Sequence, residues 1–176
     1  LVEPSASPEQ TSNAEQVKGM PGHIQGKNYI TAGCTFDQGF VWESYSDTLL
    51  LADKLGKKDP FLDTIREQIT KLDPVLVGAS GQIKEYREEN NYSDIGQERH
   101  RHISHLCPLF PGTLIKSDQP DWMQAASKTL DLRGNRTTGW ALAHRMNCRA
   151  RLGEGDEALK AYQTFIRERT VHNLWT

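Results

Sequence analysis

Apolar residues recur every three or four positions in five segments of this 176-residue chain, which is the spacing of one face of an α-helix. No stretch shows a convincing alternation of apolar and polar residues, so no β-sheet is predicted. Short connections between consecutive helices favour antiparallel neighbours. The pattern therefore predicts an all-α fold built of αα-hairpins, with helices that begin near Thr35, Pro60, Pro120, Thr138 and Asp156.

The best-defined hairpin is expected over residues 35–73. Gly56 stands where the C-cap of the first helix belongs, and Asp59 followed by Pro60 is an N-cap and first-turn signature for the second. Pro74 is expected to end that second helix. A Gly-Lys-Lys turn joins the two helices.

The other segments differ in character. Residues 1–34 carry many Pro, Gly, Ser, Asn and Gln without a period, which predicts an irregular segment, with a short strand at Tyr29–Thr31. Residues 74–119 are expected to form a long loop region, and residues 120–170 three helices. At 36% hydrophobic residues, the chain is expected to be one domain or a piece of one.

Charge and cysteine content exclude several classes of function. The formal net charge is -2 and the Lys and Arg residues are scattered, so neither nucleic acid nor a membrane is expected as a partner. Cys34, Cys107 and Cys148 are too widely spaced for a zinc ribbon and leave room for at most one disulfide.

Reactive side chains concentrate between Gly81 and Gly112. Glu85 is followed by Tyr86, and a carboxyl against an aromatic wall has its charged form desolvated, which raises its pKa toward that of a general acid. The alternative is a solvated loop carboxylate among Glu88 and Glu89.

Three histidines follow in the sequence HRHISH. The spacing of His100, His102 and His105 could supply metal ligands, but Arg101 adds a repelling charge and no carboxylate follows at a ligand spacing, so no metal is expected. On an extended loop His100 and His102 point the same way and Arg101 the opposite way. His105 is predicted to be a packed or hydrogen-bonded structural residue. His102 is better suited to hydrogen-bond a sugar hydroxyl.

The loop from Arg133 to Trp140 contains two glycines, two basic residues and an indole, which suits the lining of a polar pocket. Trp140 is equally well interpreted as a core anchor in the first turn of the following helix.

Several short sequence motifs occur along the chain in a recognisable order. They are Pro4-Ser5-Ala6-Ser7-Pro8-Glu9, Thr35-Phe36-Asp37, GQIKEY, HRHISHL with Phe-Pro-Gly, RGNRTTGWALA, RLGEGDEA and Asn173-Leu174-Trp175. In this order and spacing the chain closely resembles glycoside hydrolase family 95, the α-L-fucosidases. The resemblance implies an (α/α)6 barrel that hydrolyses terminal α-L-fucose, and in some members α-L-galactose, with inversion and without a metal or organic cofactor.

The resemblance also implies roles for single residues. Glu85 matches the general acid, and His102, with His100 beside it, matches the histidines that contact the sugar; Tyr86 and Trp140 are expected to line the same site. The chain departs from the family at Tyr86, where Trp is usual. It departs again at Phe36, where Met is usual, and at Gly134-Asn135-Arg136-Thr137, where a Gly-Asp-rich loop is usual. The last departure adds a positive charge and removes a carboxylate, so the family's pocket shape and linkage preference are not carried over to this loop.

Two parts of the family's site are expected outside this chain. The resemblance places the base carboxylate just beyond Trp175 and the water-orienting asparagines upstream of Leu1. Five of twelve barrel helices are predicted here, so we expect residues 1–176 to be an internal portion of a catalytic domain. It would be inactive alone, prone to self-association, and partnered by the remaining segments of the same domain and a fucosylated glycan. The resemblance also implies secretion or an extracytoplasmic location for the parent protein. The alternatives are a non-catalytic helical module that binds carbohydrate or protein and, third, a zinc-binding helical domain.

Overall fold

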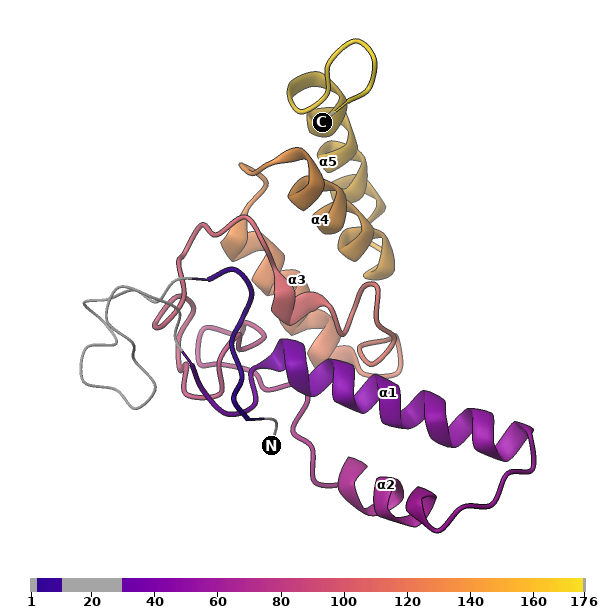
Figure 1. Cartoon of the computed structure of the whole chain (residues 1–176). Helices are drawn as coiled ribbons and strands as arrows, with labels where there is room; N and C mark the ends of the chain where they lie inside the picture. Colours follow the sequence, from indigo (N-terminus) through magenta and orange to yellow (C-terminus); the bar gives the residue numbers. More distant parts are fainter. Residues whose placement is uncertain (1–2, 11–29, 176) are drawn as a thin grey trace.

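The computed structural model describes residues 3–10 and 30–175, which form five α-helices and no β-strand. A single 3-10 turn, η1 (Ser104–Leu106), interrupts the long loop region. Figure 1 shows one helical hairpin at either end of the molecule, with the third helix and the loops between them. The all-α prediction is confirmed, and the helices are α1 (Thr35–Lys54), α2 (Phe61–Ile69), α3 (Pro120–Arg133), α4 (Gly139–Arg151) and α5 (Gly155–Glu168).

Local sequence signals account for most helix ends. Gly56 and Gly153 follow α1 and α4 with φ of 60° and 77°, in the left-handed region that a β-carbon disfavours. At the start of α2, the Asp59 carboxylate accepts a hydrogen bond of 2.8 Å from the Phe61 N–H. These predicted caps and stops are confirmed to within a residue.

Two predictions about local structure are wrong. Helix α2 was expected to continue to Pro74, but it ends at Ile69. The N–H groups of Lys71 and Leu72 instead donate to carbonyls three residues back, at 3.0 and 3.3 Å, so the last turn tightens and closes the helix. The strand expected at Tyr29–Thr31 is reduced to one β-bridge between Ser5 and Thr31. Tyr29, like the rest of residues 11–29, lies outside the described residues.

The main core forms between the loop region and α3. Because this irregular backbone is buried, its polar groups need partners other than water. Thr129 of α3 supplies one, since its hydroxyl accepts a hydrogen bond of 2.8 Å from the Ile83 N–H. The loop region is therefore fixed to α3, and the buried members of this core are Val75, Ile83, Ile103, Leu106, Leu109, Leu114, Ile115, Ala125, Ala126, Leu130 and Cys148.

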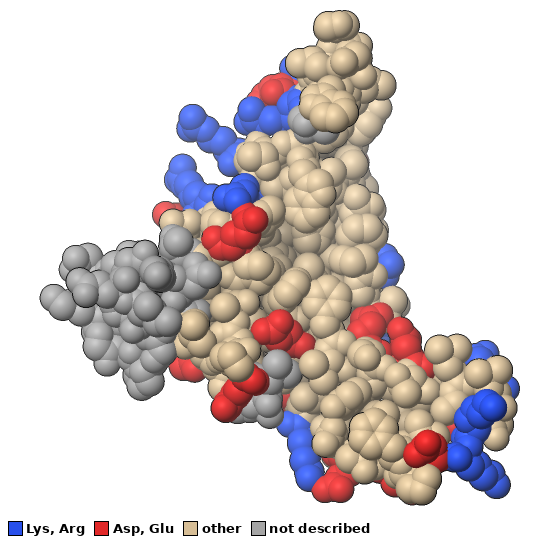
Figure 2. All heavy atoms as spheres, viewed as in Figure 1, with Lys and Arg blue, Asp and Glu red and all other residues tan. Residues whose placement is uncertain are grey.

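Both helical hairpins expose large apolar side chains. On the face shown in Figure 2, charged side chains are scattered among uncharged ones. Apolar faces of this kind are where a further helix packs. No helix in the described part of the chain is long and apolar enough to cross a membrane. The exposed apolar side chains include Phe40, Leu50, Leu51, Leu55 and Phe61 at one end, and Leu159, Tyr162 and Ile166 at the other.

Candidate active site

The carboxylate of Glu85 is buried where four separate segments meet. It is 4% exposed. Its Oε1 accepts hydrogen bonds from the hydroxyls of Ser7 at 2.5 Å and Ser104 at 3.4 Å. Its Oε2 accepts one from the Gln10 amide at 2.9 Å and one from the Arg133 guanidinium at 3.0 Å. The alternative of a solvated loop carboxylate is therefore wrong for Glu85.

The pKa of Glu85 moves opposite to the prediction. Burial by itself raises the pKa of Glu85, but attraction to His105 when that imidazole is protonated, the charge of Arg133, and the hydrogen bonds from Ser7 and Gln10 outweigh it and hold the pKa below its usual range. Nδ1 of His105 lies 3.6 Å from Oε2 of Glu85. Burial also lowers the pKa of His105 to about 4, so its imidazole is neutral near pH 7. We therefore attribute the ionised state of Glu85 to Arg133.

A neighbouring carboxyl, Glu89, has the raised pKa instead. Glu89 is 3% exposed. Its Oε2 accepts a hydrogen bond of 2.8 Å from the backbone N–H of Glu85, and its Oε1 accepts one of 3.1 Å from that of Ser93. Burial raises the pKa of Glu89 to about 7, and the charge of Glu85 adds to the effect although the two backbone hydrogen bonds oppose it. The two carboxyls thus hold different protonation states near neutral pH.

Glu89→Gln is expected to change how stability depends on pH. A carboxyl whose pKa is raised on folding contributes stability below its unfolded pKa of 4.5 and loses it as pH rises through about 7. The wild type should therefore lose about 3 kcal/mol relative to the Gln variant between pH 4 and pH 8.5. Urea unfolding at several pH values measures this difference, and the exposed Glu88→Gln is the matched control. A difference that does not vary with pH contradicts the raised pKa.

His102 lies at the open side of the site with Arg101. The Nε2 of His102 is 3.1 Å from Oε2 of Glu9, and Arg101 forms an ion pair with the same carboxylate oxygen. The prediction that Arg101 and His102 point in opposite directions is therefore wrong. The His102 N–H donates a hydrogen bond of 3.2 Å to Nδ1 of His100, which bends the backbone away from the extended form.

The other predicted site residues are unequally exposed. Trp140 is 65% exposed, with its ring centroid 5.4 Å from that of His102, so the core-anchor interpretation is wrong. His100 is 6% exposed, and His105 is 1% exposed, as predicted for a packed residue. Tyr86 has no exposed surface and packs with other buried side chains. A substrate contact by Tyr86 or His100 stays a prediction.

Two buried arginines hold the histidine segment from behind: Arg133, which begins the loop predicted to line a polar pocket, and Arg145, which no sequence motif pointed to. Arg133 donates to the carbonyls of His100 at 3.1 Å and His102 at 2.6 Å. Arg145 donates to the carbonyl of Arg101 at 2.8 Å. Three consecutive carbonyls thus bind two guanidiniums, and this fixes the backbone that carries His102.

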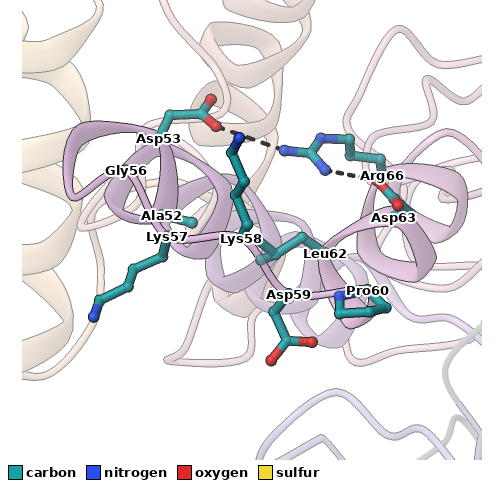
Figure 3. A pocket seen from close by; sticks show the side chains of 10 residues that line it. All are labelled: Ala52, Asp53, Gly56, Lys57, Lys58, Asp59, Pro60, Leu62, Asp63 and Arg66. Atoms are coloured by element: carbon teal, nitrogen blue, oxygen red, sulfur yellow. Dashed lines mark hydrogen bonds and ion pairs between the residues drawn. The ribbon is translucent and has the colours of Figure 1, made fainter.

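One hollow of the described surface lies away from these residues. It is at the α1–α2 turn, where Arg66 lies between Asp53 and Asp63 (Figure 3), at 3.6 and 2.9 Å. All three charged side chains are largely exposed to solvent, so these ion pairs are surface salt bridges and give no reason to expect a site there. A much smaller cavity is lined by Glu85, Glu89, His105 and Arg133, and its buried charges make it the candidate site. No group of three or more His, Cys, Asp or Glu among the described residues is arranged to hold a metal ion.

Comparison with known proteins points to one family. The family model "Glycosyl hydrolase family 95 catalytic domain" matches residues 1–176. "Probable alpha-fucosidase A" of Aspergillus niger is 32% identical over 152 residues, which cover 81% of this chain and 19% of that protein. "Alpha-L-fucosidase 2" of Arabidopsis thaliana is 29% identical over 159 residues, 89% of this chain and 18% of that protein. "Probable alpha-fucosidase A" of Aspergillus oryzae is 32% identical over 140 residues, 73% of this chain and 19% of that protein.

Proposed function

Because this chain belongs to glycosyl hydrolase family 95, we propose that it is the part of an α-L-fucosidase catalytic domain that carries the general acid, Glu85. The chain spans about a fifth of the length of the curated relatives it matches. Its all-α fold agrees with a portion of an (α/α)6 barrel. The substrate we propose is a glycan with terminal α-L-fucose.

One observation carries this proposal: residues from three of the family's sequence motifs lie around a single carboxyl. Ser7, Ser104 and Arg133 all donate hydrogen bonds to Glu85, and they belong to three motifs that are far apart in the sequence. Ser7 and Ser104, which are 97 residues apart, also hydrogen-bond to each other at 2.5 Å. A purely structural loop gives no reason for these motifs to meet at a single ionisable group.

In the proposed reaction, Glu85 protonates the leaving glycosidic oxygen while a carboxylate on the opposite face activates water. The guanidinium of Arg133 then stabilises the Glu85 carboxylate that forms as the proton leaves. Ser7 and Gln10 donate to Glu85 in this structure, and one of these bonds must give way to the glycosidic oxygen. His102 and Trp140 lie on the open side, where a neutral imidazole can donate to and accept from hydroxyls.

The stereochemistry of the first product tests this proposal. An inverting enzyme releases β-L-fucose from an α-L-fucoside, whereas a retaining one releases α-L-fucose, and proton NMR distinguishes the two before mutarotation. We expect β-L-fucose from a protein that contains this chain within its complete catalytic domain. The isolated chain is the control and should show no turnover, because a general acid without an opposed base lacks the concerted geometry. Initial release of α-L-fucose contradicts inversion.

A second candidate is a helical module that binds carbohydrate without turnover. The observation in its favour is the Glu85–Arg133 pair, whose side chains are 5% and 2% exposed and which alone has the character of a structural ion pair. Binding of fucosylated glycan by the complete domain, with no release of fucose, would favour this candidate.

A further inference from the structure

We propose that Arg133 is a positioning residue that ties the Glu85 carboxyl to the His100–His102 backbone, and that its charge sets the pH above which the acid stops working. This inference rests on the proposed role of Glu85. It concerns a residue that contacts the carboxyl of the proposed acid and, in the proposed reaction, does not contact the sugar. The guanidinium would act through Glu85 and through the backbone that carries His102.

The three guanidinium nitrogens of Arg133 donate hydrogen bonds to four acceptors. Nη2 donates to Glu85 at 3.0 Å, and Nη1 donates to the carbonyls of His100 and His102 at 3.1 and 2.6 Å. Nε donates to the hydroxyl of Tyr92 at 3.0 Å. The side chain is 2% exposed, so water cannot replace a lost bond. A guanidinium has five N–H donors spread over three nitrogens, whereas an ammonium group has three donors on one nitrogen and cannot satisfy all four acceptors.

The charges around Glu85 leave Arg133 as the cation that governs its ionisation. Burial lowers the pKa values of His100 and His105, so both imidazoles are neutral near pH 7. Arg145 lies behind the same backbone and donates to carbonyls, not to Glu85. The described titratable and charged groups that face Glu85 are Glu89, Tyr92, His100, His105 and Arg133.

The sign of the effect follows from this environment. An opposite charge within hydrogen-bond distance lowers the pKa of a carboxyl by about one to three pH units. A general acid works only while it is protonated, so activity falls on the alkaline side of the pH–rate profile as Glu85 loses its proton. By lowering the pKa of Glu85, Arg133 moves this alkaline limb to lower pH. Loss of the charge should move that limb back toward higher pH. A merely structural ion pair would change stability and rate without moving the limb.

The test compares Arg133→Gln and Arg133→Lys in the complete, active catalytic domain. For kcat/KM on a fucoside with a poor leaving group, we expect R133Q to move the alkaline limb up by about one to three pH units. R133K keeps the charge but loses the fork, so its limb should stay within about half a unit while kcat falls at least about tenfold.

Arg149→Gln is the matched control. Arg149 is another buried arginine, 7% exposed, but it pairs with Asp131 at 2.6 Å and Glu154 at 2.5 Å, away from Glu85. R149Q should lower stability and leave the limb where it is. An unmoved limb in folded R133Q contradicts the inference.

The variant Glu85→Gln distinguishes failure of the proposed function from failure of the inference about Arg133: a lost general acid slows cleavage of a sugar leaving group far more than cleavage of an activated aryl leaving group. If E85Q shows the signature of a lost acid and R133Q has a normal limb, only the inference about Arg133 fails. If E85Q lacks that signature, the proposed function fails. Where R133Q is too unstable to assay, R133K decides alone, and a kcat within about twofold of the wild type contradicts the positioning role.

Discussion

Glu85→Gln is expected to lower kcat/KM on a fucoside with a sugar leaving group by about 10²- to 10⁴-fold, and to affect an activated aryl fucoside far less. The reason is that a sugar alkoxide leaves poorly unless it is protonated, whereas a nitrophenolate leaves without help. Gln is close in shape to Glu but has no proton to give. Steady-state kinetics on the two substrates, in the complete catalytic domain, measure the ratio of the two losses.

The design needs a control for the ion pair that this substitution breaks. Without Glu85, Arg133 keeps its bonds to backbone carbonyls but loses its charged partner, so some loss of stability is expected. Glu88→Gln makes the same chemical change on the same loop at an exposed position and should leave both substrates unaffected. Equal losses on both substrates in folded E85Q argue against the acid role and favour a structural one.

The low pKa of Glu85 in this chain is compatible with the acid role only if another group raises it. A second carboxylate nearby would do so, because like charges disfavour ionisation of each other. The inverting mechanism requires such a carboxylate across the sugar. Glu89 does not serve this purpose, because burial raises its pKa to about 7 and it carries no negative charge in the acidic range where Glu85 titrates.

Helix positions were predictable because their signals are local. Gly56, Asp59 and Gly153 each fix a helix end through contacts within a few residues. Among the helix ends, only that of α2 was predicted wrongly, because the apolar spacing continues to Leu72 although the helix ends at Ile69. The site was predicted far less completely than the helices, because the environment of Glu85 depends on Gln10 and Arg133, which lie 75 and 48 positions away in the sequence. No periodicity in the sequence reports such contacts.

A partial signal for the buried arginines was present in α4. Arg145 and Arg149 occupy helical positions on the same buried face as Leu142 and Cys148. A charge at an apolar position is buried only when several acceptors surround it, so this pattern could have pointed to a bound backbone or carboxylate. Glu89 carried no comparable signal, because its neighbours Glu88 and Asn90 are exposed.

Arg145→Met is expected to cost about 3–5 kcal/mol of unfolding free energy. The side chain is 1% exposed and donates to the carbonyls of Gly134 at 2.9 Å and Arg101 at 2.8 Å. Met fills a similar volume but cannot donate, so these carbonyls lose a charged partner. Urea unfolding measures the loss. Arg151→Met, at an exposed site of the same helix, should stay within about 0.5 kcal/mol.

The same variant separates support of the histidine backbone from control of the acid. Arg145 holds the carbonyl of Arg101 but does not contact Glu85, so R145M should lower stability and weaken sugar binding while the alkaline limb stays in place. R133Q should lower stability and also move the limb. If R145M unfolds at the same urea concentration as R151M, the buried guanidinium does not support the histidine segment. If R145M moves the limb as far as R133Q does, the effect belongs to the loop as a whole and not to the charge beside Glu85.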